Sequence, residues 1–249
     1  MAIAQGQLGP RVRWAFSDRL AVDGVVSSGA PYDAFNVADH VGDDPDAVQA
    51  HRDALAESVG VQGHRLVSMA PVHGNDVGEV GAPQPDPVPE VDALVTRVPG
   101  IALLTVAADC VPVLLGDSDA GVVAVVHAGW RGIRSDVVGT TLASMVELGA
   151  EASRIRAVVG PAVCGLCYDV PRDRYDEVVA VAPSAASVAR DGAPGLDLRA
   201  AAVDRLRRAG AHVSLHGGCT QESDDLYSFR RDRLTGRHGG VVALVPEQR

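Results

Sequence analysis

The chain has 249 residues, of which 47% are hydrophobic and 22% are charged, so it can bury a large core. Its net charge of −10 disfavours binding to the phosphate backbone of nucleic acids, and no apolar run approaches the roughly 20 residues that a membrane span needs. With four cysteines and no recognisable signal peptide, we expect a cytoplasmic protein with free thiols rather than a disulfide-bonded one.

The predicted elements are a few helices among many short apolar strands. Asp44 and Pro45 supply an N-cap and a first-turn proline, which predict a helix ending near Val59. The chain then continues with strands at 65–68, 93–95, 101–107, 111–115 and 122–127, a helix at 135–148, a strand at 155–159, helices at 171–181 and 198–209, and strands at 212–215 and 241–245. We expect loops at 81–89, which is rich in proline, and at 183–195.

The middle third of the chain runs from strand to strand with little room for crossover helices. This order favours an α+β fold with a largely β core over a regular doubly wound sheet. We predict a single domain over residues 1–249, in which residues 1–11 form a loose N-terminal extension.

Three residues that bind metals well each lie where an apolar run meets a turn: His73, Cys110 and His127. Two imidazoles and a thiolate suit Zn²⁺, and three protein ligands would leave a fourth position open, as in catalytic sites. Zinc would lower the pKa of a bound water towards ~7. Asp109 is then a candidate general base, or a partner that orients a ligand. Because spacing alone does not join these residues, each of them could instead be an ordinary packed side chain.

A second set of metal-binding residues competes with the first. Cys164 and Cys167 form a Cys-x-x-Cys pair, and His216 and Cys219 repeat its spacing. Together they could hold a structural zinc ion with four ligands, or the first two could form a redox pair. The sequence around them lacks the strand-to-helix turn of a thioredoxin-type motif.

Residues 227–237 contain four arginines within eight positions, which is unusual in so acidic a chain. Such a block could grip a phosphate group through bidentate hydrogen bonds. It could equally be a solvated basic loop paired with surface carboxylates. The sequence leaves both interpretations open.

Taken together, these segments resemble a known family. The motifs are Pro-Tyr-Asp…Asn at 31–36, Gly-Asp-Asp-Pro at 42–45, Val-His-Gly at 72–74, Ala-Asp-Cys-Val-Pro-Val at 108–113, His-Ala-Gly-Trp-Arg-Gly at 127–132, Gly-Pro-Ala…Cys-Tyr-Asp-Val at 160–170 and Tyr-Ser-Phe-Arg-Arg at 227–231. The chain is similar to the laccase-domain or YfiH-like family, long labelled polyphenol oxidases and now regarded as purine nucleoside phosphorylases.

The resemblance implies a β-sandwich core flanked by helices and a zinc site formed by His73, Cys110 and His127. It implies phosphorolysis of adenosine, inosine and 5′-methylthioadenosine, with inorganic phosphate as co-substrate and adenosine deamination as a second activity. Cys110, His127 and Asp109 would be the catalytic residues. Substrate and phosphate would contact Asn36, Arg52, Arg131, Arg230 and Arg231.

The sequence departs from the family at two positions. Pro71 stands where a glutamine usually precedes the Val-His-Gly motif, and proline removes a backbone donor and fixes φ. His51 stands where the family usually has asparagine, beside the retained Arg52. Both changes bear on substrate preference and leave the zinc ligands intact.

Other functions remain open on the sequence. In an amide hydrolase that edits peptidoglycan precursors, Cys110 would be a thiolate nucleophile activated by His127. A non-enzymatic, zinc-stabilised binding module is a third class. A copper-dependent phenol oxidase fits least, because a multicopper site needs more histidines than the eight present. We expect a small-molecule nucleoside as the partner, no nucleic acid or membrane, and a monomer or homodimer.

Overall fold

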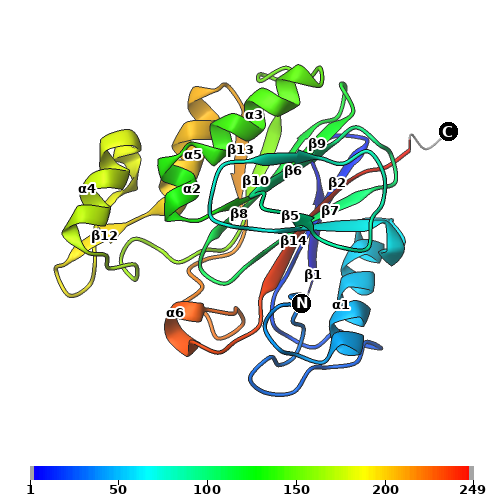
Figure 1. Cartoon of the computed structure of the whole chain (residues 1–249), viewed down its shortest axis with the longest axis horizontal. Helices are drawn as coiled ribbons and strands as arrows, with labels where there is room; N and C mark the ends of the chain where they lie inside the picture. Colours follow the sequence, from blue (N-terminus) through cyan, green and yellow to red (C-terminus); the bar gives the residue numbers. More distant parts are fainter. Residues whose placement is uncertain (1–2, 247–249) are drawn as a thin grey trace.

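The computed structural model describes residues 3–246, which form two large sheets packed face to face with helices outside both (Figure 1). The first sheet has the order β1 (Ile3–Gln7), β2 (Val12–Ser17), β14 (His238–Leu244), β7 (Ala102–Ala107), β3 (Leu66–Ala70) and β5 (Val88–Pro89). The second has the order β13 (His212–Leu215), β10 (Arg156–Val159), β8 (Val111–Asp117), β9 (Val122–Ala128), β6 (Ala93–Thr96) and β4 (Val77–Glu79). Both sheets mix parallel and antiparallel pairs.

The central strands are apolar on both faces because both faces are covered. In β9, Val123 and Val125 pack between the sheets, whereas Val122, Ala124 and Val126 pack towards the helices. Since successive side chains of a strand point to opposite faces, such a strand reads as a continuous apolar run. This explains why β8 and β9 carry no alternating polar pattern.

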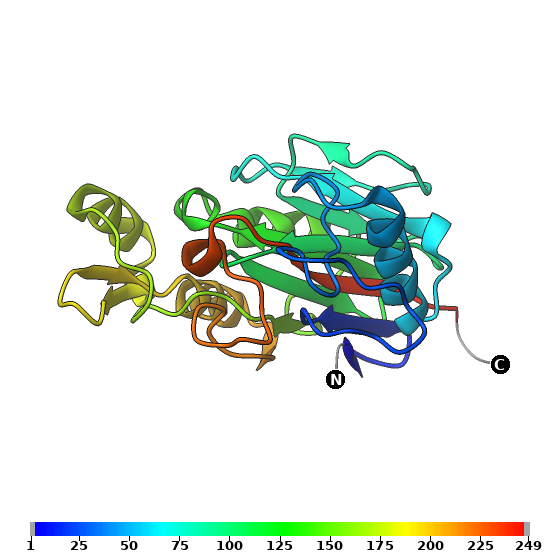
Figure 2. The ribbon, with the colours of Figure 1, turned by 90° about the horizontal axis from the view of Figure 1, so that it is seen from below.

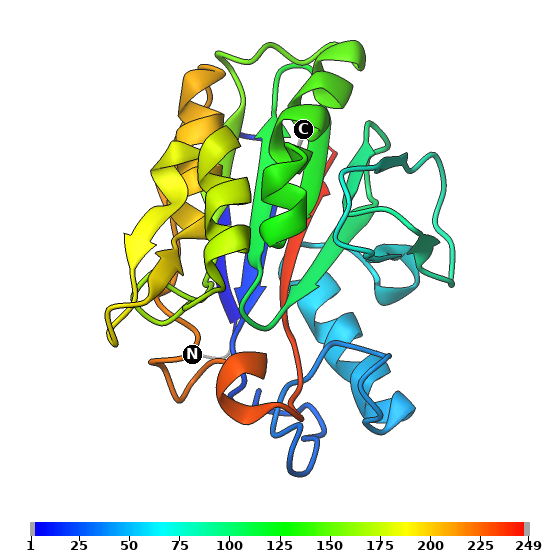
Figure 3. The ribbon, with the colours of Figure 1, turned by 60° about the vertical axis from the view of Figure 1, so that its left-hand side comes forward.

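Helices cover the outer faces of both sheets. Helix α1 (Pro45–Ser58) packs on the first sheet, with Leu55 in its apolar cluster. The second sheet is covered by α2 (Trp130–Arg134), α3 (Val137–Glu147) and α5 (Leu198–Arg208), as Figure 3 shows. Helix α4 (Arg172–Val181) and the hairpin of β11 (Ala186–Val188) and β12 (Pro194–Leu196) lie at one end of the molecule, far from α1 (Figure 2). A short helix, α6 (Phe229–Asp232), precedes β14.

The predicted fold class is confirmed: an α+β domain whose sandwich core is flanked by helices. The predicted helix caps form. The side chain of Asp44 accepts a hydrogen bond from the Asp46 N–H, and that of Asp136 accepts one from the Gly139 N–H. The predicted helices and strands all form, with ends that match or are shifted by at most three residues.

Several segments differ from the expectation. Ile3–Gln7 pair with β2 and Leu8 is buried, so this part of the expected loose extension belongs to the sheet, while residues 1–2 lie outside the described residues. Residues 183–195 contain the β11–β12 hairpin rather than a plain loop. Strand β2 was not predicted because its polar and apolar positions do not alternate cleanly, and the short helices α2 and α6 were not predicted because a single helical turn carries no readable apolar period.

Among the described residues, no helix is both long enough and apolar enough to cross a membrane.

Candidate active site

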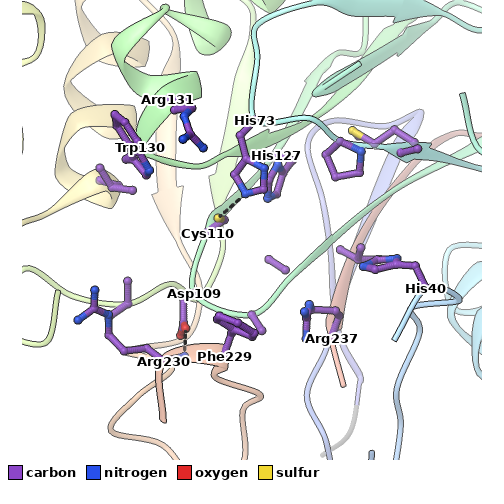
Figure 4. Close-up of a pocket in the computed structure, with 18 of the residues that line it drawn as sticks. His40, His73, Asp109, Cys110, His127, Trp130, Arg131, Phe229, Arg230 and Arg237 are labelled. Carbon is purple, nitrogen blue, oxygen red and sulfur yellow. Dashed lines mark hydrogen bonds between the residues drawn. The ribbon is translucent and has the colours of Figure 1, made fainter. Parts of the chain in front are cut away.

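A pocket of about 730 Å³ opens at one end of the sandwich, between the β7–β8 turn, the loop after β3, and α6 (Figure 4). The pocket is lined by all three candidate metal ligands, His73, Cys110 and His127. Two of the arginines predicted to bind substrate, Arg131 and Arg230, also line it. Residues distant in the sequence are therefore gathered around one cavity, which is large enough for a nucleoside-sized ligand.

The three candidate metal ligands converge. The Sγ atom of Cys110 lies 3.9 Å from Nε2 of His73, and the rings of His73 and His127 are 4.9 Å apart between centroids. One ligand atom from each of the three lies within 4.8 Å of the others. Antiparallel pairing of β8 with β9 places Cys110, just before β8, beside His127, near the end of β9. His73 has a φ of 63°, a left-handed conformation in which the loop aims the ring at the sulfur.

A buried carboxylate that the sequence did not single out orients the histidines. Oδ1 of Asp92 accepts hydrogen bonds from Nδ1 of His127 at 2.9 Å and from the backbone N–H of His73 at 3.0 Å. Oδ2 accepts from the N–H groups of Gly74, at 2.6 Å, and Val72, at 3.1 Å. With its Nδ1 thus engaged, His127 turns Nε2 to the site, as in carboxylate–histidine–metal arrangements. In the sequence, the only sign of this role was that Asp92, a charged residue, directly precedes the apolar strand at 93–95.

The electrostatics favour a deprotonated sulfur. Burial raises the pKa of Cys110, but the neighbouring imidazoles of His127 and His73 outweigh it and lower that pKa to about 6. Burial likewise lowers the pKa of His127, whereas the Cys110 sulfur and Asp92 raise it to about 10. Metals bind the thiolate and the neutral imidazole, so zinc binding would release the proton of His127, and the donor set of one sulfur and two imidazoles then fits Zn²⁺.

A glycine makes room for this cluster. A Cβ atom placed on Gly129 would lie 2.7 Å from Cδ2 of His73 and 3.2 Å from Sγ of Cys110. The backbone of Gly129 has an ordinary φ of −78°, so its need for glycine is purely steric. The first glycine of the His-Ala-Gly-Trp-Arg-Gly motif, Gly129, thus leaves the space that the side chains of His73 and Cys110 occupy.

Asp109 lines the pocket, but its carboxylate is already occupied. It accepts hydrogen bonds from Oγ1 of Thr220 at 2.6 Å, from Oγ of Ser228 at 2.7 Å and from the backbone N–H of Arg230 at 2.6 Å. Figure 4 shows it beside Arg230, with Cys110 beyond it. These hydrogen bonds join the turn that carries Asp109 and Cys110 to the N-terminus of α6. They suit a residue that anchors this turn better than a general base.

The predicted substrate-binding arginines separate into two groups. Arg131 and Arg230 line the pocket, each over an aromatic ring: 4.7 Å from the Trp130 centroid and 4.7 Å from that of Tyr168. The guanidinium of Arg230 also pairs with Asp169 at the pocket wall, whereas Arg231 donates to the carbonyls of the loop before α6, at Thr220, Ser223 and Leu226.

The two remaining predicted contacts, Asn36 and Arg52, are not among the residues that line this pocket. Arg52 donates to the Val37 carbonyl and pairs with Asp39, and Asn36 is fully buried, with its amide bonded to Ala38 and Asp43. His51, the departure from the family pattern, lies in the same buried region, where Nδ1 faces the Asn36 carbonyl at 2.7 Å and Nε2 faces the Val26 carbonyl at 2.6 Å.

Further cationic residues of the pocket were missed. Arg233 and Arg237 come from the arginine block that the sequence did identify, and Arg174 comes from α4, whose charges look like an ordinary solvated face. Nη1 of Arg237 donates to the carbonyls of Thr235 and Gly236, which fixes its guanidinium at the pocket wall. His40 also lines the cavity.

Known proteins are similar to this chain over nearly all of its length. The chain is 48% identical over 233 residues to a purine nucleoside phosphorylase of Streptomyces coelicolor, covering 93% of this chain and 95% of that protein. It is 43% identical over 239 residues to a purine nucleoside phosphorylase of Corynebacterium glutamicum, covering 95% and 96%.

Solved structures show the same fold. The crystal structure of Bacillus licheniformis hypothetical protein YfiH has a TM-score of 0.84 at 25% identity, covering 95% of this chain and 97% of that one. YlmD from Geobacillus stearothermophilus has a TM-score of 0.84 at 29% identity, covering 97% and 94%. The pattern of the family described as multi-copper polyphenol oxidoreductase laccase matches residues 13–245, and the chain therefore belongs to that family.

Proposed function

We propose that this protein is a zinc-dependent purine nucleoside phosphorylase that acts on adenosine, inosine and 5′-methylthioadenosine, with adenosine deamination as a second activity. The observation that carries the proposal is one pocket in which the His73, Cys110 and His127 group lies among cationic side chains. The names of the curated relatives, at 43% and 48% identity over nearly the whole chain, support the purine nucleoside phosphorylase activity.

The metal-binding group supplies the electrophilic part of the site. Bound by His73, Cys110 and His127, zinc would act as a Lewis acid towards an oxygen or nitrogen of the substrate. Asp92 holds His127 in one orientation, and the loop that carries His73 is held by three backbone hydrogen bonds to the same carboxylate. Such rigid support keeps the reacting groups in place.

The arginines supply the phosphate site. Figure 4 shows Arg131 on one side of the metal-binding group, with Arg230 and Arg237 on the other. In phosphorolysis, a phosphate oxygen attacks the anomeric carbon, the bond to the purine nitrogen breaks, and the purine leaves with the electron pair and takes up a proton. Guanidinium groups hold the phosphate dianion for this attack through charge-assisted hydrogen bonds.

Aromatic side chains border the same cavity. Phe229 and Trp130 line the pocket, and Phe229 is 47% exposed although its side chain is large and apolar. An exposed ring at a pocket wall offers a stacking surface for a purine. We therefore place the base against Phe229 or Trp130, with the sugar towards the metal-binding group.

One observation favours a second candidate. Cys110, His127 and Asp92 stand in the order of a thiol hydrolase, with His127 hydrogen-bonded to the carboxylate. An amide hydrolase that edits peptidoglycan precursors would use this arrangement with a free thiolate. A thiolate held by zinc is a poor nucleophile, so metal content separates the two functions. The same analysis reports copper, which the phenol-oxidase alternative needs.

The test is metal analysis of the purified protein, combined with chromatography of adenosine and inosine incubated with and without phosphate. We expect zinc in the wild type and phosphate-dependent release of free base, both of which Cys110→Ala abolishes at the catalytic site. Inosine formed from adenosine without phosphate would report the deamination. Protein that lacks zinc at Cys110 and leaves both nucleosides unchanged would overturn the proposal and direct the search to amide substrates.

A matched pair of variants tests the phosphate site. Arg230→Gln should raise the KM for phosphate about tenfold, equivalent to about 1.4 kcal/mol, because one charge-assisted contact is lost. Arg208→Gln removes an arginine that lies on α5 and does not line the pocket, so it should leave that KM unchanged. Equal KM values for both variants would exclude Arg230 from phosphate binding.

A further inference from the structure

A second group of metal-binding side chains lies outside the catalytic pocket. One ligand atom from each of Cys164, Cys167, Cys219 and Glu222 lies within 4.8 Å of the others. The two cysteines of the Cys-x-x-Cys pair come from the segment after β10, whereas Cys219 and Glu222 come from the segment between β13 and α6. The fold, rather than local sequence, therefore assembles this group.

Backbone contacts hold the two segments in register. Ala162 and Cys219 form a parallel β-bridge, and the Cys167 N–H donates to the Cys164 carbonyl at 3.0 Å, which closes the turn between the two cysteines. The Cys164 N–H donates to Sγ of Cys219 at 3.3 Å. A backbone N–H aimed at a sulfur stabilises the thiolate, the form that binds a metal.

The fourth ligand differs from the sequence-based expectation. His216 is not in this group, because its ring stacks on Phe16, with 5.4 Å between centroids, and lies 5.7 Å from the ring of Trp14. Glu222 takes its place: Sγ of Cys167 lies 3.4 Å from Oε1 of Glu222, and the Glu222 N–H donates to the Cys219 carbonyl. The sequence spacing of His216 and Cys219 was therefore misleading.

We propose that Cys164, Cys167, Cys219 and Glu222 bind a structural zinc ion. Three thiolates and one carboxylate complete a tetrahedral shell with no open position, which is typical of structural rather than catalytic zinc. Soft sulfur ligands select zinc over magnesium or calcium. The guanidinium of Arg190 pairs with Glu222 and offsets part of the excess negative charge of such a shell.

The position of the site suggests what the metal does for the enzyme. Thr220, next to Cys219, donates its hydroxyl to Asp109, and the Val163 N–H, next to Cys164, donates to the Asp109 carbonyl at 3.1 Å. Asp109 directly precedes Cys110. The metal would therefore join the two segments that hold the turn that carries Asp109 and Cys110. This role does not depend on which reaction the pocket performs.

Metal analysis of the full chain, purified under reducing conditions, tests the proposal. We expect two zinc ions per chain in the wild type and one in each of Cys110→Ser and Cys219→Ser. One zinc in the wild type and none in Cys110→Ser would overturn it. Intact mass that is lighter by two hydrogens, with the loss mapped to Cys164 and Cys167, would assign a disulfide and overturn it as well.

Cobalt substitution gives a readout that requires neither activity nor the loss of a cysteine in the cluster. Cobalt loaded into Cys110→Ser should show a sulfur-to-metal charge-transfer band about three times as intense as that of a single thiolate. The milder change Glu222→Gln should keep the fold and shift this spectrum. A cobalt-loaded Cys110→Ser without the band would contradict the three-thiolate site, whether or not Cys219→Ser folds.

Thermal unfolding of Cys110→Ser adds the structural test. A strong chelator should lower its Tm, because a metal that binds only the folded state stabilises it. The double variant Cys110→Ser with Cys219→Ser should be insensitive to the chelator. Equal chelator responses in both would show that the stabilising metal, if any, is bound elsewhere.

Discussion

One oxygen of the Asp92 carboxylate, Oδ1, accepts two hydrogen bonds: from Nδ1 of His127 at 2.9 Å and from the backbone N–H of His73 at 3.0 Å. One buried side chain thus orients two of the three candidate metal ligands. Burial alone would raise the pKa of Asp92, but the hydrogen bonds from His127 and Gly74 lower it below the usual value. The charge is therefore retained where it can support the metal-binding group.

Replacing Asp92 by asparagine should weaken metal binding. Asp92→Asn keeps the shape but removes the charge, so His127 loses its ionic partner and we expect metal affinity to fall about 10–100-fold. The loss of hydrogen-bond acceptors should also lower the free energy of unfolding by about 1–3 kcal/mol. Competition with a chromogenic chelator measures the affinity. Asp86→Asn, at an exposed position, is the control, and equal affinities for both variants would remove Asp92 from the metal site.

Gly129→Ala tests the steric wall behind the ligands. The added Cβ would approach His73 and Cys110 more closely than side chains normally do, while the backbone at this position accepts alanine. We expect a marked loss of bound zinc and of activity, with the fold retained. Gly81→Ala meets nothing within 4 Å and should leave metal content unchanged. Full zinc occupancy in Gly129→Ala would show that the ligand cluster is looser than described.

Asp109→Asn distinguishes an anchor from a general base. Asp109 has a φ of 96°, which asparagine tolerates better than most residues, and its hydrogen bonds reach Thr220, Ser228 and the backbone of Arg230. An anchoring role predicts a lower Tm and a reduced kcat/KM with an unchanged shape of the pH–rate profile. Loss of one limb of that profile would instead establish Asp109 as the base.

His238 should make stability depend on pH. It is fully buried in β14, and both ring nitrogens have no hydrogen-bond partner among residues 3–246. Burial lowers its pKa from 6.5 to about 4, and the charge of Arg237 adds to this, against the opposing effect of Asp109. Because the unfolded chain takes up a proton on this residue at higher pH than the folded one, its contribution is present above pH 6.5 and is lost as pH falls towards 4.

The magnitude is measurable by comparison with His238→Leu. Between pH 7 and pH 4, the wild type should lose about 3 kcal/mol more of its unfolding free energy than the variant. Denaturant unfolding of both proteins at several pH values gives the difference and removes contributions that they share. Parallel pH dependences would mean that His238 titrates alike in the folded and unfolded chains.

The sequence predicted the local structure well where local physics decides it. The Asp44–Pro45 and Asp136 caps and the apolar runs of β7, β8 and β9 are set by residues close in the chain, and all of them form. Strand β2 was missed because its polar and apolar positions follow no clean alternation, and α6 because it is a single turn capped by Ser228.

The chain by itself determined the fold class and, through the motif residues, the three metal-ligand candidates. Tertiary structure alone decided the rest: Asp92 rather than Asp109 supports the histidines, Arg237 faces the pocket while Arg231 holds a loop, and Glu222 replaces His216 beside the cysteines. The physical reason is that propensities, caps and apolar runs act over a few residues, whereas hydrogen-bond partners and ligand shells join segments tens of residues apart. Sheet pairing and loop packing bring those segments together, and no local pattern records them.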